Sequence, residues 1–205
     1  MIVRKTEQLS GSRVKIYLDE EIAFVLYKGE LRLYGIAEGA ELSDSVWQEI
    51  RNDVLKKRAC LRCMNLLKQR PYTTAQLRQK LLDGGCLPEL AEEALAYVAS
   101  YGYVDDRRYT EEYIWYQREK KSRRRIEEEL VRKGISREMV REVFMQAEET
   151  GEGTDDLKLA CQLLEKKHYD AACADYKERQ KIAAWLYRKG IGMDTIRRAM
   201  DLSEY

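Results

Sequence analysis

The sequence predicts a mainly α-helical protein: an elongated array of three tandem three-helix repeats, preceded by a small N-terminal β-hairpin or antiparallel sheet. Three observations support this fold class. Apolar residues alternate with polar ones up to about residue 42 and recur at helical spacing from there on. Three stretches of the helical part align with one another without a gap. A glycine stands one residue before the end of each stretch, as expected for stacked helical units.

The N-terminal part has the period of two that is typical of strands. Apolar and polar residues alternate over residues 14–18, and residues 22–27 form an apolar run. The polar residues 19–21 separate these two runs, so together they predict a β-hairpin. Residues 2–9 offer a further strand, and residues 31–34 follow a turn signal at residues 28–30. We therefore expect a sheet of three or four strands. The alternation is clearest at Val14, Ile16 and Leu18.

The helical part contains an internal repeat. Residues 77–86, 126–135 and 182–191 align without a gap, and their glycines lie 49 and 56 residues apart. Each glycine falls where a helix ends, and glycine takes the left-handed conformation of that position at least cost. The glycines are Gly85, Gly134 and Gly190. An apolar helix face follows each of them, at Leu90, Ala91, Ala94 and Leu95, at Met139, Val140, Val143 and Phe144, and at Thr195, Ile196, Ala199 and Met200.

Capping signals divide this part further. A capping-box pattern at Ser45 opens the helical region, a second one lies at Thr73, and Ser122 stands at the equivalent position of the next repeat. We expect Asp105 and Asp106 to stabilise the start of the following helix. The expected divisions are an N-terminal β subdomain at 1–43, a connecting helix at 44–58, and helical repeats at 59–105, 106–150 and 151–205.

Composition argues against an enzyme. The chain has one His and none of the glycine-rich phosphate-binding or HExxH motifs, so we expect no catalytic residues and no cofactor. Cys60 and Cys63 have CxxC spacing but no second pair, so we expect reduced thiols beside the core and no metal. No apolar run is long enough to span a membrane, and the N-terminus does not begin like a signal peptide. These features predict a soluble, cytoplasmic protein.

Three motifs resemble the RecX family of regulatory proteins, which modulate the bacterial recombinase RecA. They are RPYTTAQLRQKL at 70–81, YVDDRRY at 103–109 and RRIEEELVRKGI at 124–135, and the resemblance extends over residues 58–200. It implies a protein without a cofactor that binds RecA, above all the RecA–ssDNA filament, and we expect this protein to be a monomer. It also implies inhibition of filament growth, ATPase and strand exchange in recombination, DNA repair and SOS control, with weak direct DNA binding left open.

Two other classes remain open: a helix-turn-helix-like DNA-binding protein, and a general helical-repeat scaffold for other proteins. The charge balance of 37 Lys and Arg against 36 Asp and Glu argues against a dedicated DNA-binding protein. Basic residues nevertheless cluster locally, since residues 118–125 and 177–198 each carry a net charge of +5.

The placement of the first cluster is informative. If Ser122 caps a helix, Arg123, Arg124 and Arg125 occupy its first turn, where the helix dipole opposes cations. Our hypothesis is that free amides and guanidiniums of this turn contact DNA phosphates or acidic RecA side chains. The alternative is a solvated turn offset by residues 127–129. The candidate binding residues are Lys120, Lys121, Arg123, Arg124, Arg125, Arg132, Lys133, Lys181, Arg188, Lys189, Arg197 and Arg198.

Tyrosines form a stripe on the helix before this cluster. Tyr109, Tyr113 and Tyr116 recur at helical spacing, and we interpret them as packing residues of the core or of a junction between repeats.

Overall fold

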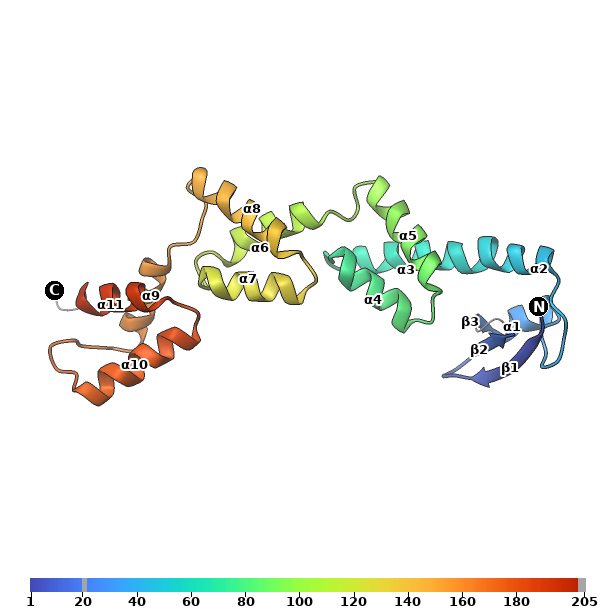
Figure 1. The fold of residues 1–205 in the computed structure, drawn as a ribbon, viewed down its shortest axis with the longest axis horizontal. Coiled ribbons are helices and arrows are strands. Elements are labelled where there is room, and N and C mark those ends of the chain that lie inside the picture. The colour runs from blue at the N-terminus through green and yellow to red at the C-terminus, as the bar shows by residue number, and fades with distance from the viewer. Residues whose placement is uncertain (20–21, 203–205) are drawn as a thin grey trace. The chain divides into compact units, whose positions relative to one another are not determined.

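A computed structural model describes residues 1–19 and 22–202. The chain is mainly helical, with three three-helix domains and a small N-terminal antiparallel sheet, which confirms the predicted fold class (Figure 1). It divides into two compact units, residues 1–105 and residues 106–205, and each is described by itself.

The sheet of the N-terminal unit has three antiparallel strands in the order β1-β2-β3: Val3–Gln8, Arg13–Leu18 and Ala23–Tyr27. The predicted alternation is confirmed, because Val14, Ile16 and Leu18 are all buried. The tip of the predicted β2–β3 turn, residues 20–21, lies outside the described residues.

A fourth strand at residues 31–34 was a wrong prediction. This segment belongs to helix α1, Lys28–Leu33, and to the residue that ends it. The Glu30 carboxylate accepts a hydrogen bond from the backbone N–H of Tyr27 at 2.8 Å and so satisfies a donor at the start of the helix. Glu30 also pairs with Arg58 of a later helix, at 2.5 Å. The carboxylate therefore favours a helix where the apolar pattern suggested a strand.

A continuous helical stretch leads from the sheet into the first repeat. It consists of α2, Asp44–Glu49, a π-helical segment, Ile50–Lys56, and α3, Lys57–Leu67. Its N-cap is Ser43 and not the predicted Ser45: Ser43 has extended backbone, and its hydroxyl accepts the N–H of Val46. Ser45 already lies in the first turn, because the cap position requires the non-helical backbone that Ser43 supplies.

Each remaining domain core is shared by three helices. In the N-terminal unit, α3 packs with α4, Thr74–Asp83, and α5, Pro88–Ser100. The C-terminal unit holds α6, Asp106–Gln117, α7, Arg123–Arg132, and α8, Arg137–Glu149, followed by α9, Asp156–Lys166, α10, Tyr176–Arg188, and α11, Met193–Leu202. The three repeat glycines confirm the predicted left-handed conformation, with φ of +82° at Gly85 and +89° at Gly134 and Gly190.

The cysteines of the CxxC pair lie beside the core, as predicted. Cys63 is fully buried and Cys60 packs at its edge, whereas Cys173 is exposed. Burial raises the pKa of Cys63 to about 11. At neutral pH its thiolate fraction is therefore roughly a hundredfold below that of an ordinary cysteine.

We expect alkylation of the native protein to modify Cys173 long before Cys63, because access and thiolate content both protect Cys63. Peptide mass spectrometry after timed labelling at pH 8 checks the order. Labelling in denaturant is the control and removes the difference. Equal rates in the native protein contradict the prediction.

Candidate functional site

Ser122 organises the start of α7, as its position predicted. Its hydroxyl accepts a hydrogen bond from the backbone N–H of Arg125 at 3.4 Å, and it donates to the backbone carbonyl of Lys189 at 2.8 Å. The side chain is fully buried. One hydroxyl therefore caps its own helix and fixes the Lys189–Gly190 turn of the following repeat.

Arg123 is held by contacts on several sides. Its backbone N–H donates to Asp156 Oδ1 at 3.0 Å, and its guanidinium pairs with Glu127 at 2.9 Å and with Glu148. The guanidinium also lies over the ring of Phe144, 4.8 Å from the centroid. Partial burial raises the pKa of Asp156. This carboxylate supplies the negative charge that a helix N-terminus favours, and it offsets the cost of cations there.

Arg124 and Arg125 are paired within their own helix. Arg124 lies 3.1 Å from Glu128, and Arg125 lies 3.2 Å from Glu129. Glutamates 127–129, one helical turn further on, thus contact all three arginines. This is the geometry expected if these glutamates offset the charge of the basic turn. The backbone amides of Arg123 and Arg125 are occupied, so the hypothesis of free first-turn amides was wrong for these two, because Asp156 and Ser122 accept from them.

A second network covers the side of α6 and α7. Tyr113 donates to Glu129 at 2.5 Å, and Lys121 pairs with the same carboxylate at 2.6 Å. Partial burial acts to raise the pKa of Glu129, but the hydrogen bonds from Lys121 and Tyr113 outweigh it and lower the pKa. Lys133 lies over the stacked rings of Tyr109 and Tyr113, 5.9 and 5.3 Å from their centroids. Two predicted binding residues, Lys121 and Lys133, are therefore engaged in local packing.

The tyrosine stripe is confirmed at two of its three positions. Tyr109 and Tyr113 pack against the domain core, but Tyr116 is 69% exposed, so its assignment to packing was wrong. The buried face of α6 is centred on Thr110 and Ile114. Two residues further on, Tyr116 points about 200° away from Ile114 around the helix.

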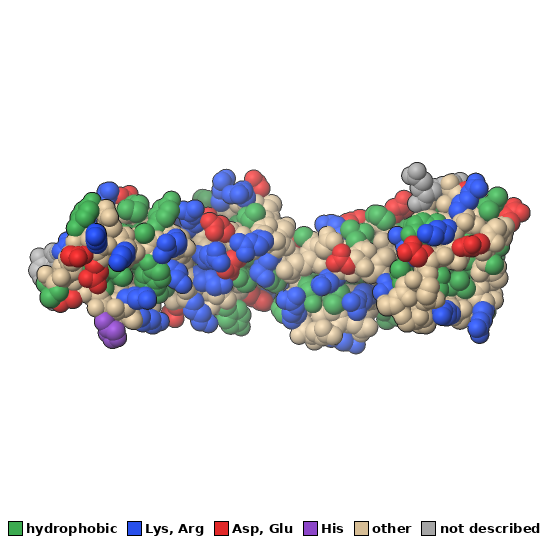
Figure 2. Space-filling view, turned by 90° about the horizontal axis from the view of Figure 1, so that it is seen from below, with side chains coloured by type: hydrophobic (Ala, Val, Ile, Leu, Met, Phe, Trp, Pro, Cys, Tyr) green, Lys and Arg blue, Asp and Glu red, His purple; other side chains and the backbone are tan. Residues whose placement is uncertain are grey.

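The second basic cluster differs from the first. Lys177, Lys181 and Arg188 follow one another along α10 and line an open groove with Tyr187 and Met193. The three cations are exposed, and they make no ion pair within residues 1–19 and 22–202. In Figure 2, blue Lys and Arg side chains lie among green apolar ones over the C-terminal part of the chain. We call Lys177, Lys181 and Arg188 the α10 stripe.

The other candidates lie at the surface. Lys120, Arg124, Arg125, Arg132, Lys189, Arg197 and Arg198 are exposed. Lys189 Nζ lies over the ring of Trp185, 5.8 Å from its centroid, and Arg197 lies 3.8 Å from Asp194. The sequence-based selection missed Lys177, Tyr187 and Met193. The spacing of 177, 181, 184 and 188 along one helix face is the signal that could have found the stripe.

Other kinds of site find little support. Within the described part of the chain, no three His, Cys, Asp or Glu side chains come together in a way that could hold a metal ion. The helices described here are all too short or too polar to cross a membrane.

Family models match all three helical domains. The models described as the first, second and third three-helix domains of RecX match residues 59–97, 105–143 and 154–200. The curated Regulatory protein RecX of Trichlorobacter lovleyi is 31% identical over 69% of this chain and 92% of its own length. That of Caldanaerobacter subterraneus subsp. tengcongensis is 27% identical over 99% of this chain and 100% of its own length.

Solved structures share the fold. A crystal structure of regulatory protein RecX superimposes with a TM-score of 0.64 at 22% identity and covers 98% of both chains. RecX from Lactobacillus salivarius has a TM-score of 0.61 at 18% identity, covering 73% of this chain and 96% of the other.

Proposed function

The chain belongs to the RecX family of regulatory proteins, and from this premise we propose that it binds RecA, above all RecA polymerised on single-stranded DNA. Binding limits filament growth and with it the ATPase and strand-exchange activities of RecA. The protein thereby acts in recombination, DNA repair and control of the SOS response, without chemistry of its own.

The α10 stripe is the observation that supports this proposal. Three exposed cations, which form no ion pair with any residue that the structure describes, lie beside Tyr187 and Met193, which are 47% and 45% exposed. Cations of this kind contact phosphates or carboxylates without first breaking an internal pair, and the apolar neighbours add contact area. A filament of protein on DNA offers both kinds of partner.

The α7 arginines have a secondary role in this proposal. Arg124 and Arg125 are exposed and extend the basic surface, but each must share its guanidinium with a glutamate of its own helix. Arg123 holds the junction between α7, α8 and α9 through Glu148, Phe144 and Asp156. We therefore assign the principal filament contact to α10.

The test is the ATPase activity of the cognate RecA on single-stranded DNA, titrated with this protein from well below stoichiometric to equimolar amounts. We expect ATPase activity to fall as the protein is added. A DNA-dependent ATPase unrelated to RecA serves as the control and keeps its activity. An unchanged RecA ATPase at every ratio contradicts the proposal.

The alternatives give different results. A helix-turn-helix-like protein binds bare DNA without RecA, with an affinity that falls steeply as salt rises. A scaffold for other proteins shows no difference between pull-downs with and without RecA filaments. The chain is nearly neutral and its local excess of positive charge lies in two short stretches, residues 118–125 and 177–198, which favours a mixed surface of protein and DNA over bare DNA.

A further inference from the structure

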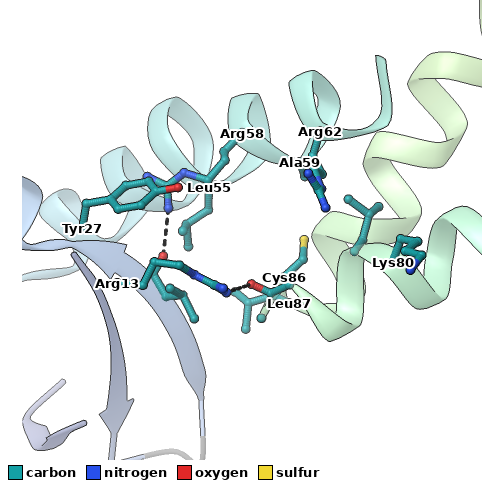
Figure 3. Close-up of a pocket in the computed structure, with 13 residues that line it drawn as sticks. Arg13, Tyr27, Leu55, Arg58, Ala59, Arg62, Lys80, Cys86 and Leu87 are labelled. Atoms are coloured by element: carbon teal, nitrogen blue, oxygen red, sulfur yellow. Dashed lines mark hydrogen bonds between the residues drawn. The ribbon is translucent and has the colours of Figure 1, made fainter. Parts of the chain in front are cut away.

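A cation-lined pocket lies in the N-terminal unit, away from the α10 stripe in the sequence. It has a volume of about 270 Å³ and lies between strands β2 and β3, helix α3 and the turn that joins α4 to α5 (Figure 3). Its basic lining residues are Arg13, Arg58, Arg62 and Lys80, from three different elements. The residues described as lining it include no Asp or Glu.

Two of these cations are fixed in place. The Arg13 guanidinium reaches from the sheet to the α4–α5 turn and donates to the backbone carbonyl of Gly84 at 2.6 Å. Arg58 donates to the carbonyl of Val25 at 2.9 Å and pairs with Glu30 at 2.5 Å. Its guanidinium also lies over the ring of Tyr27, 4.7 Å from the centroid. A wall whose side chains are already ordered binds a ligand at lower entropic cost.

The other two cations lack a counter-charge. Arg62 lies one helical turn beyond Arg58 and extends towards Cys86, while Lys80 lies on α4 (Figure 3). Both are exposed and form no ion pair with any described residue. Among the described residues, the four cations therefore share one paired carboxylate, that of Glu30, and the pocket retains a net charge of about +3.

The rest of the lining strengthens this charge. Val25, Leu55 and Leu81 are buried and form an apolar wall next to the cations. Charges beside apolar walls interact more strongly than charges in open water. Burial also raises the pKa of the Cys86 thiol to about 11, so the thiol stays neutral and adds no negative charge.

We propose that this pocket binds a compact phosphate group, supplied by a nucleotide or as free phosphate. Cations on β2, α3 and α4 surround the cavity, and a tetrahedral phosphate has enough oxygens to serve all three directions, whereas a carboxylate has two oxygens in one plane. The forked donors of Arg13 and Arg62 suit phosphate oxygens. Tyr27, which is 42% exposed, also lines the pocket.

Isothermal titration calorimetry with inorganic phosphate, pyrophosphate and dAMP tests the proposal. We expect saturable binding by the full chain, and about tenfold weaker binding for each of the substitutions R62A and K80A. Tighter binding of dAMP than of phosphate identifies a nucleotide as the source, and equal binding identifies the phosphate group alone. An acidic peptide is the competing ligand, and its binding in place of phosphate overturns the proposal.

The double variant R62A/K80A removes two positive charges from the pocket, and its matched control is K28A/K68A, which removes the same charge from exposed positions outside the pocket. It should bind as the wild type does. Arg62 and Lys80 are exposed and form no ion pair among the residues described, so far-UV circular dichroism should show the pocket variants folded. As a second readout, bound phosphate should slow the alkylation of Cys86. Equal binding by R62A/K80A and the wild type overturns the proposal and leaves the assignment of filament binding to α10 untouched.

Discussion

Replacing Gly190 with alanine is expected to destabilise the C-terminal unit by about 2–5 kcal/mol. Gly190 has φ of +89°, a conformation that costs any other residue free energy. A Cβ there would lie 2.5 Å from the Ser122 hydroxyl oxygen and 3.4 Å from the backbone nitrogen of Arg125. That hydroxyl is fully buried and engaged in two hydrogen bonds, so it cannot move aside without losing them.

Chemical denaturation monitored by circular dichroism measures this loss. The matched control is Gly192→Ala, two residues further on. Gly192 has no positive φ, and an added Cβ meets nothing within 4 Å. The control should therefore lie within about 1 kcal/mol of the wild type. Equal stabilities for the two variants would show that the Lys189–Gly190 turn does not depend on its close approach to Ser122.

The features that the sequence predicted correctly depend on neighbours close along the chain. The left-handed glycines, the caps at Thr73 and Ser122, and the alternation in β2 each require a few adjacent residues. The wrong strand at residues 31–34 shows the limit. Its helix is favoured by the Glu30 carboxylate, and that carboxylate is positioned in part by Arg58, which lies 28 residues further along the chain.

The same distinction between features set by nearby residues and features set by distant ones applies to the candidate site. The position of Ser122 as an N-cap predicted that three arginines occupy the first turn of α7, and the structure confirms this placement. Their partners from later helices, Asp156 and Glu148, lie 33 and 25 residues away from Arg123, so no local pattern could identify them. The pocket is equally out of reach, since Arg13 and the Gly84 carbonyl it contacts are 71 residues apart.

Reversing the charges of the α10 stripe is expected to have the largest effect on activity. The triple substitution of Lys177, Lys181 and Arg188 by Glu removes three cations that form no ion pair within the described part of the chain. If each contributes about 1 kcal/mol to filament binding, the concentration for half-inhibition of RecA ATPase rises roughly a hundredfold.

The triple substitution of Arg123, Arg124 and Arg125 by Glu should have a smaller effect on filament contact, because those side chains already bind glutamates.

Charge-matched controls separate contact from a general electrostatic effect. Arg137, Arg141 and Lys166 are exposed cations of the same unit that lie outside α10, and their triple change to Glu alters net charge equally. This control should inhibit RecA nearly as the wild type does.

The stripe variant should still fold. Glu at position 177 lies in the first turn of α10, where the helix dipole favours a negative charge. Glu at position 188 lies in the last turn and costs about 0.3–1 kcal/mol, a loss that circular dichroism and Tm can measure. Inhibition that survives in the stripe variant and disappears in the α7 variant would move the filament contact from α10 to α7.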